Sequence, residues 1–323
     1  MANNIDGDDV FLYTGEGQEV PEDVIHVRID ESVTFIPSEA FYWRTFLVSV
    51  EMHNGVEQIL AHAFWMCTSL TSINLSGVEI IDESAFKGCK NLADVDFGEK
   101  LDVIGREAFK SCHSLKNIVL KNVRAIAFGA FSSCRNLADV ECGEKLMRIE
   151  GNAFFNQCRS LRRIVIPLKV DMVGFYDRAF NSDGLSKIDL VGGIHKTISS
   201  LHLDSWKSQM NQQINRVNLT LPTVPAGSKT TFIQDWIVST HRRFNHCKKE
   251  HYKLLKEATT LLELALWKSM LEINADSSFE VNPKKKAKID DMTSRTKQRI
   301  ASGAAMSIVI KNVLPFLRLE ELK

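Results

Sequence analysis

The chain has 323 residues, of which 44% are hydrophobic and 25% charged, and its formal net charge is zero. These values are typical of globular proteins. No stretch approaches the roughly 18 uninterrupted apolar residues of a membrane span, so we expect no membrane partner. The acidic first residues lack an apolar run behind a basic start, so we expect no signal peptide.

The N-terminal part is predicted to begin with a leader over residues 1–20, which contains one short strand at Val10 to Tyr13. Residues 24–30 then alternate apolar and polar side chains. This alternation predicts a strand with Val27 and Ile29 on one face. The strand opens a repetitive region that we place at residues 21–195.

A module recurs through the repetitive region. Its first part is an apolar triplet, and the copies are Val33, Ile36, Phe41; Val56, Ile59, Phe64; Val78, Ile81, Phe86; Leu101, Ile104, Phe109; Val123, Ile126, Phe131; Leu146, Ile149, Phe154; and, loosely, Met172, Phe175, Phe180. Its second part is a β-patterned set such as Leu70, Ile73 and Leu75. Self-similarity at this period predicts a solenoid. We predict an α/β leucine-rich-repeat solenoid of about seven modules, with a ladder of short parallel strands and short helical turns.

Five modules carry a cysteine at the same point: Cys67, Cys89, Cys112, Cys134 and Cys158. A metal or redox ladder is one interpretation. Adjacent coils would, however, hold the sulfurs in single file about 4.8 Å apart, whereas a zinc site needs four ligands converging at about 2.3 Å. We therefore interpret them as buried core thiols. The odd total of seven cysteines also favours an intracellular protein, cytoplasmic or nuclear, over a secreted disulfide framework.

Residues 201–323 are predicted to form an all-α domain. Apolar residues recur at spacings of three and four over residues 201–218, and a helix-compatible run extends from Ser228 to Ile273. A basic linker follows at residues 274–291, and a last helix is predicted from Thr293 to Leu314. Within the linker, four lysines resemble a short nuclear-import signal, although a solvated charged linker is the alternative: Lys284, Lys285, Lys286 and Lys288.

The modules, written C-x-x-L-x-x-I-x-L…V-x-x-I-x-x-x-AF, resemble BspA-type leucine-rich repeats. The second half is similar to a helical region attached to such repeats in a group of diatom proteins. The stretches that carry this similarity are GGIHKTISSLHLDSW from Gly192, KEATTLLELALWKSML from Lys256 and VIKNVLPFL from Val309. The resemblance implies a protein-binding scaffold without catalysis.

Strand residues that alternate away from the core are the candidate binding surface for a protein partner. We predict that they form one continuous face, acidic through its middle: Ser49, Glu51, Ser72, Asn74, Asp94, Asp96, Asn117, Val119, Asp139, Glu141 and Arg163. Side chains held on a rigid sheet lose little entropy on binding, which suits protein recognition. There are two alternatives. The face could simply be exposed to solvent, or it could be a docking surface for the chain's own basic helices.

Charge is unevenly distributed and supports a rival hypothesis. Residues 1–200 hold 20 Lys and Arg against 28 Asp and Glu, and residues 201–323 hold 20 against 12, which gives −8 and +8. The basic helical residues could bind the phosphates of a nucleic acid, in a nuclear protein. They are Arg242, Arg243, Lys248, Lys249, Lys253 and Lys256.

Motifs of catalysis and cofactor binding are missing from the sequence. We find no phosphate-binding glycine loop, dinucleotide motif or nucleophile elbow. One group of residues resembles a metal site: His241, His246, Cys247 and His251. It supports a third and weaker hypothesis, a metal hydrolase. His241 and His246 are five residues apart and diverge on a helix. We therefore predict no enzyme, no cofactor, no metal and no catalytic residue.

Overall fold

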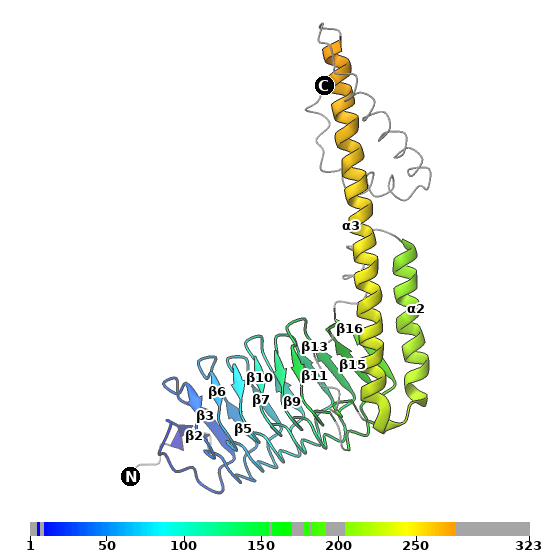
Figure 1. The fold of residues 1–323 in the computed structure, drawn as a ribbon. Coiled ribbons are helices and arrows are strands. Elements are labelled where there is room, and N and C mark those ends of the chain that lie inside the picture. The colour runs from blue at the N-terminus through cyan, green and yellow to red at the C-terminus, as the bar shows by residue number, and fades with distance from the viewer. Residues whose placement is uncertain are drawn as a thin grey trace. The chain divides into compact units, whose positions relative to one another are not determined.

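The computed structural model describes residues 5–6, 10–154, 157–169, 178–180, 182–191 and 204–275 (Figure 1). The chain divides into two compact units. The first contains Met1–His195 with Gln209–His241, and the second contains Lys196–Ser208 with Arg242–Lys323. The first unit holds the repeats and the ends of the two helices that close them.

The repeats build a parallel β-solenoid of about seven turns, as predicted. Its first strand series begins with two strands that precede the first module, β2 (Val10–Tyr13) and β3 (His26–Ile29). One strand per module follows: β5 (Ser49–Glu51), β7 (Ser72–Asn74), β9 (Asp94–Asp96), β11 (Asn117–Leu120), β13 (Asp139–Cys142), β15 (Arg163–Ile166) and β16 (Lys187–Leu190). Strands β2 to β9 form one parallel sheet, to which β1 (Ile5–Asp6) adds antiparallel, and β11 to β16 form another. Because β2 pairs with β3, the ladder already begins inside the predicted leader.

The return path of each coil differs from the prediction. Short helical turns were expected there, but the described coils carry a second parallel ladder and tight turns. We call it the return ladder, and its strands are β4 (Phe35–Ile36), β6 (Gln58–Ile59), β8 (Ile80–Ile81), β10 (Val103–Ile104), β12 (Ala125–Ile126) and β14 (Arg148–Ile149).

Backbone conformation explains why the turns cannot become helices. In successive coils a residue with positive φ stands two positions before the buried phenylalanine, as Glu39 does before Phe41, and another two positions after it, as Trp43 does. A left-handed residue interrupts a right-handed helix. The amides of these two residues and of the phenylalanine bond to the next coil instead, and the N–H of Phe41 donates to the carbonyl of Ala63 at 2.8 Å.

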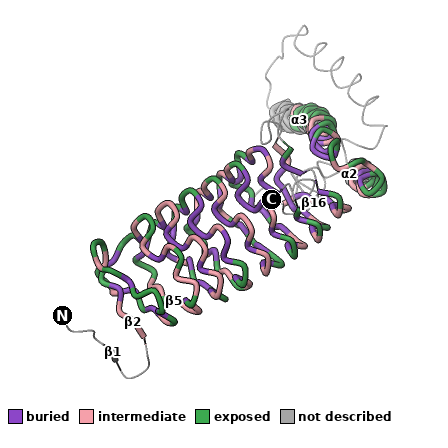
Figure 2. Tube along the Cα trace, turned by 90° about the horizontal axis from the view of Figure 1, so that it is seen from below, coloured by how far each residue is buried: buried purple, intermediate pink, exposed green. Residues whose placement is uncertain are grey.

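The interior of the solenoid is a stack of identical layers. Buried and exposed segments alternate around the coils in Figure 2, and the predicted phenylalanines that the structure describes are fully buried. Met172 and Phe175 of the last, loose triplet lie outside the described residues. Six rings, from Phe41 to Phe154, stack face to face with centroids 4.9–5.5 Å apart and interplanar angles of 2–8°. Each coil therefore buries its ring on its neighbour, and no coil could do so alone.

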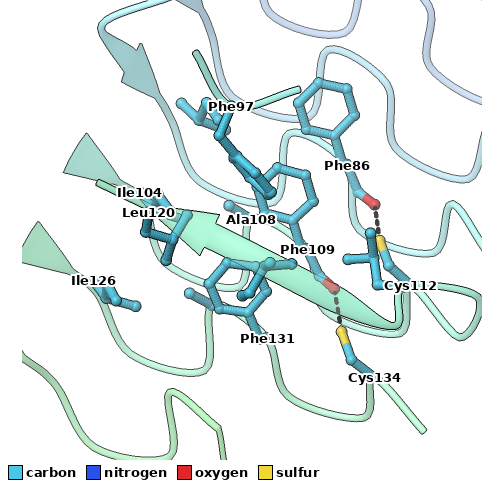
Figure 3. Close-up of a cluster of buried hydrophobic side chains, with 14 of the residues drawn as sticks. Phe86, Phe97, Ile104, Ala108, Phe109, Cys112, Leu120, Ile126, Phe131 and Cys134 are labelled. Atoms are coloured by element: carbon cyan, nitrogen blue, oxygen red, sulfur yellow. Dashed lines mark hydrogen bonds between the residues drawn. The ribbon is translucent and has the colours of Figure 1, made fainter. Parts of the chain in front are cut away.

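The cysteine column is buried next to the rings, as predicted. Each thiol also donates to the carbonyl of a phenylalanine in an adjoining coil, at 3.1 Å for Cys112 to Phe86 and for Cys134 to Phe109 (Figure 3). The same bond joins Cys67 to Phe41 at 3.0 Å. The thiols are therefore donors to buried backbone carbonyls as well as small core residues.

Two helices follow the last described strand: α2 (Asp204–Thr220) and, after the short 3-10 turns η2 (Leu221–Thr223) and η3 (Ala226–Ser228), α3 (Lys229–Ala275). Helix α3 is continuous for 47 residues, which confirms the run predicted from Ser228 to Ile273. In the described part of the chain, no helix combines the length and apolar character needed to cross a membrane. The import-like lysines, the last predicted helix and most of the basic linker lie outside the described residues.

The end of the solenoid is closed by polar side chains from these helices. The Asn218 amide oxygen accepts from the N–H of Ile188 at 2.9 Å, and its amide nitrogen donates to the carbonyl of Ile188 at 3.1 Å, so it occupies the place of a next strand beside β16. The buried Lys229 donates to the carbonyls of Asp183 and Leu185 at 2.9 and 2.6 Å. These bonds explain why residues 209–241 belong to the unit of the repeats.

Candidate protein-interaction surface

We define the strand face as the outward-pointing side chains of the first strand series, which lie where the alternation of the sequence placed them. They stand in two columns. Strand pairing aligns Ser49 with Ser72 and Asp94 in one column, and Asn117 with Asp139 and Arg163 in its continuation. The second column pairs Asn74 with Asp96, and Val119 with Glu141. Most of these side chains are exposed, and Ser49, Asp139 and Arg163 are half-buried.

Charge compensation differs between the ends and the middle of the strand face. Near one end, Arg28 pairs with Glu51 at 2.7 Å. Near the other, Arg163 pairs with Asp189 at 2.7 Å, and Lys187 lies 3.4 Å from the same carboxylate.

In the middle, three carboxylates have no ion-pair or hydrogen-bond partner within the described residues: Asp94, Asp139 and Glu141. Asp96 accepts from the N–H of Gly98 at 3.0 Å, which leaves it charged and exposed. Two exposed cations, Lys116 and Arg162, stand one residue before β11 and β15. The strand face is therefore acidic in its middle, and its remaining charge is available to a partner.

The predicted continuity of the strand face needs one correction. Strands β9 and β11 belong to different sheets. The interruption coincides with Phe97, which takes the place of the smaller Leu75 and Leu120 and packs edge-on against Phe109 at 5.4 Å. The phenylalanine stack continues across this point, with Phe86 and Phe109 5.1 Å apart. The strands β9 and β11 therefore still belong to neighbouring coils, although they lie in different sheets.

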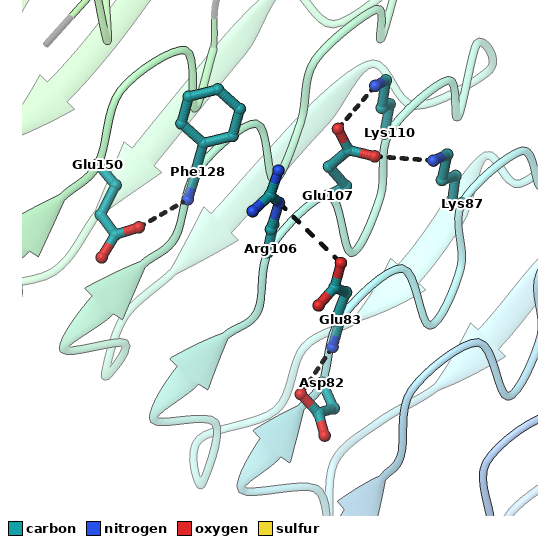
Figure 4. Close-up of polar contacts among 8 residues, drawn as sticks. All are labelled: Asp82, Glu83, Lys87, Arg106, Glu107, Lys110, Phe128 and Glu150. Atoms are coloured by element: carbon teal, nitrogen blue, oxygen red, sulfur yellow. Dashed lines mark hydrogen bonds and ion pairs between the residues drawn. The ribbon is translucent and has the colours of Figure 1, made fainter.

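A second surface, along the turns between the ladders, was missed by the sequence analysis. Tyr42 packs edge-on against Trp65 at 5.1 Å, and the Lys87 ammonium lies 5.3 Å from the Trp65 ring. Lys87 and Lys110 converge on Glu107, each at 2.7 Å (Figure 4). The same column of the repeat holds Tyr42, Trp65, Lys87 and Lys110. That column could have been found from the sequence once the phenylalanines were aligned.

The buried thiols offer no nucleophile. Desolvation raises the pKa of Cys67 and of Cys142 to about 12 and that of Cys158 to about 11. A thiol with a raised pKa stays protonated at neutral pH and is unreactive. The column therefore contributes to packing rather than to chemistry.

The histidine cluster also lacks the geometry of a metal site where it can be described. Among the described residues, no three His, Cys, Asp or Glu side chains gather in a way that could hold an ion. Cys247 is buried, and desolvation raises its pKa. The side chain of His251 lies outside the described part.

The predicted basic helical residues lie on α3, where Arg242, Arg243, Lys249, Lys253 and Lys256 are exposed. The side chain of Lys248 lies outside the described part. We define the α3 stripe as Arg242, His246, Lys249, Lys253 and Lys256, whose spacings of four and three place them along one side of the helix. No ion pair of the stripe lysines and Arg242 occurs within the described residues.

The repeats match a known family. Six copies of the BspA type leucine rich repeat region match in overlapping stretches at residues 22–122, 61–186 and 102–209. These stretches together cover more than half of the 323 residues. The chain therefore belongs to the BspA-type leucine-rich-repeat family. The matches end at residue 209, so the similarity of the helical part to diatom proteins stays a prediction.

Three solved structures are similar to this chain. A leucine-rich-repeat protein of T. pallidum is 26% identical, with 50% of this chain and 65% of that one covered and a TM-score of 0.37. One from Bacteroides ovatus is 21% identical, with 56% and 52% covered and a TM-score of 0.44. The pneumococcal vaccine antigen PcpA is 18% identical, with 54% and 47% covered and a TM-score of 0.40.

This chain thus spans between about half and two thirds of the length of these solved proteins. A comparison with curated proteins gave no match.

Proposed function

We propose that the chain is a non-catalytic scaffold that binds a protein partner through its strand face. The supporting observation is a set of carboxylates that have no partner within the described residues, Asp94 on β9 with Asp139 and Glu141 on β13, between ends whose charges are already paired. A rigid surface pays little entropy for ordering its side chains on binding. Its charge selects partners that are basic at the contact.

The test is affinity purification of the tagged full chain at two salt concentrations, followed by mass spectrometry. Partners of the strand face should be lost from a variant with Asp94→Lys and Asp139→Lys. The matched control reverses Glu57 and Glu79 to Lys, because both are exposed carboxylates that precede strands of the return ladder. If every partner stays bound to the first variant, the strand face is not the binding surface.

Nucleic-acid binding is the second candidate function, and the α3 stripe is the observation that favours it. Cations along one side of a helix can follow a phosphate backbone. Among the side chains of α3 that the structure describes around the stripe, Tyr252 is the one exposed tyrosine, phenylalanine or tryptophan that could stack on a base, which makes single-strand binding the weaker variant. A steep salt dependence of binding to duplex DNA, lost on Lys249→Glu with Lys253→Glu, would support this function over the first.

A further inference from the structure

The strand face and the α3 stripe carry opposite charges, and the spacing between coils is nearly equal to the rise of one turn of an α-helix. Neighbouring strands of a sheet lie about 4.8 Å apart, and the phenylalanine rings of the coils that carry β9, β11 and β13 stack with centroids 5.1 and 5.4 Å apart. One turn of an α-helix rises about 5.4 Å, and residues i and i+7 lie roughly 10.5 Å apart. A helix laid across the strands can therefore present one turn to each coil.

The order of side chains also corresponds. On the strand face, the carboxylates of β9 and β13 flank β11, whose outward side chains Asn117 and Val119 are uncharged. On α3, Lys249 and Lys256 are seven residues apart and flank a turn that presents Tyr252 to one side and Lys253 to the other. Val119 and Tyr252 are 45% and 57% exposed. Both surfaces thus have two like charges around a central apolar side chain.

We propose that the α3 stripe of one copy docks on the strand face of a second copy. Lys249 and Lys256 would pair with the carboxylates of β9 and β13, and Tyr252 would cover Val119. Because each copy carries both surfaces, two reciprocal contacts close a dimer with twofold symmetry. The inference rests on the proposed function, since it makes a basic helix the class of partner that the strand face accepts.

The docking explains how a chain of zero net charge keeps two surfaces of opposite sign. Exposed like charges repel one another, whereas opposite surfaces on separate copies attract and orient them. The same contact would occupy the strand face, so an external partner would have to compete with the second copy. Self-association would therefore limit access to the proposed binding site.

Sedimentation of the full chain tests the proposal. We expect dimers at about 0.1 M salt and monomers at about 1 M, because the screening length falls from about 10 to about 3 Å. A face variant (Asp94→Lys with Asp139→Lys) and a stripe variant (Lys249→Glu with Lys256→Glu) should each lose dimerisation by about a hundredfold, since like charges would meet. Circular dichroism verifies that both variants are folded.

Mixing the two variants separates this proposal from its competitors. In the face variant both surfaces are basic, and in the stripe variant both are acidic. Each contact between the two variants therefore joins a basic surface to an acidic one. The mixture should form dimers that neither variant forms alone. Controls are Arg243→Glu, about a quarter-turn from the stripe, and Glu57→Lys with Glu79→Lys, both of which should dimerise.

Three results would overturn the proposal. A wild type that is monomeric at every salt concentration, or a mixture that stays monomeric, rules out the second copy and leaves docking within one chain. A monomer that binds duplex DNA through Lys249 and Lys256 assigns the stripe to nucleic acid. If external partners still depend on Asp94 and Asp139 in either case, the proposed function stands and only the dimer is wrong.

Discussion

The interior and the strand face belong to the same coils, yet their sequences follow different rules. Inside, six successive coils keep a phenylalanine at the same place, as Phe86, Phe109 and Phe131 do, because each ring must fit the ring of its neighbour. Outside, β7 presents Ser72, β9 presents Asp94 and β11 presents Asn117. Side chains in water do not have to match the next coil, so they can vary. The comparison teaches that repetition maintains the fold, whereas the exceptions to repetition carry the proposed function.

The largest expected effect comes from breaking one layer of the interior. Replacing Phe109 with Ala should lower the free energy of unfolding by about 3–5 kcal/mol, because it leaves a cavity within the stack. Phe109→Leu should cost less because it keeps apolar volume. Equilibrium urea unfolding measures both, and Asp94→Lys with Asp139→Lys serves as the contrast, with a change within about 0.5 kcal/mol. Equal losses in all variants would remove the distinction between interior and face.

The second prediction concerns the end of the repeats, where the next coil is replaced by side chains. Lys229→Met should destabilise the unit by about 2–3 kcal/mol, because the carbonyls of Asp183 and Leu185 lose a charged donor while remaining buried. Asn218→Leu should cost a similar amount for its two bonds to Ile188. Hydrogen exchange should show the loss in β16 first. Unchanged protection there would mean that the helices do not close the ladder.

The thiol column predicts a specific dependence on pH. Burial raises the pKa of Cys67 from 9.0 to about 12, so above pH 9 the unfolded chain releases a proton that the folded protein keeps. The unfolded state then binds fewer protons, and stability falls as pH rises. The contribution of this thiol to the free energy of unfolding is fully present below pH 9. It falls by about 1.4 kcal/mol per pH unit as the pH rises towards 12.

Cys67→Ala removes this one term, so the variant should lose stability less steeply than the wild type between pH 9 and pH 11. Urea unfolding at several pH values measures the two slopes. Parallel slopes would mean that this thiol already ionises in the folded protein. Thiol-directed reagents at pH 8 should label the denatured chain rapidly and the native chain slowly.

The smallest effect lies in the turns. Ser133 has φ of 62° and Gly129 has φ of 66°, so one position carries the strain of a left-handed side chain and the other avoids it. Ser133→Gly should stabilise by about 0.5 kcal/mol, since relief of strain exceeds the added freedom of the unfolded chain. Gly129→Ala should destabilise by about 1 kcal/mol. A Cβ there has room, with its nearest neighbour at 3.5 Å, so packing does not mask the effect.

By itself the sequence determined the interior of this protein. The triplets, the cysteine column and the outward strand residues follow from a period of 22 or 23 residues, because each of them contacts its own counterpart in the next coil. The helical run from Ser228 to Ile273 was predicted for a related reason, since helical contacts are local, whereas the sequence left open whether it forms one helix or two. What recurs along the chain can be inferred from recurrence alone.

Only the tertiary structure decided the rest. The return ladder replaced the expected helical turns because left-handed residues direct amides to the next coil, and these left-handed residues share no residue type, as Glu39, His62 and Ser84 illustrate. The closure by Asn218 joins it to Ile188, 30 positions away, with no repeat to indicate the contact. A contact made once, between distant residues of unlike type, leaves no periodic signal, and so its geometry must be seen.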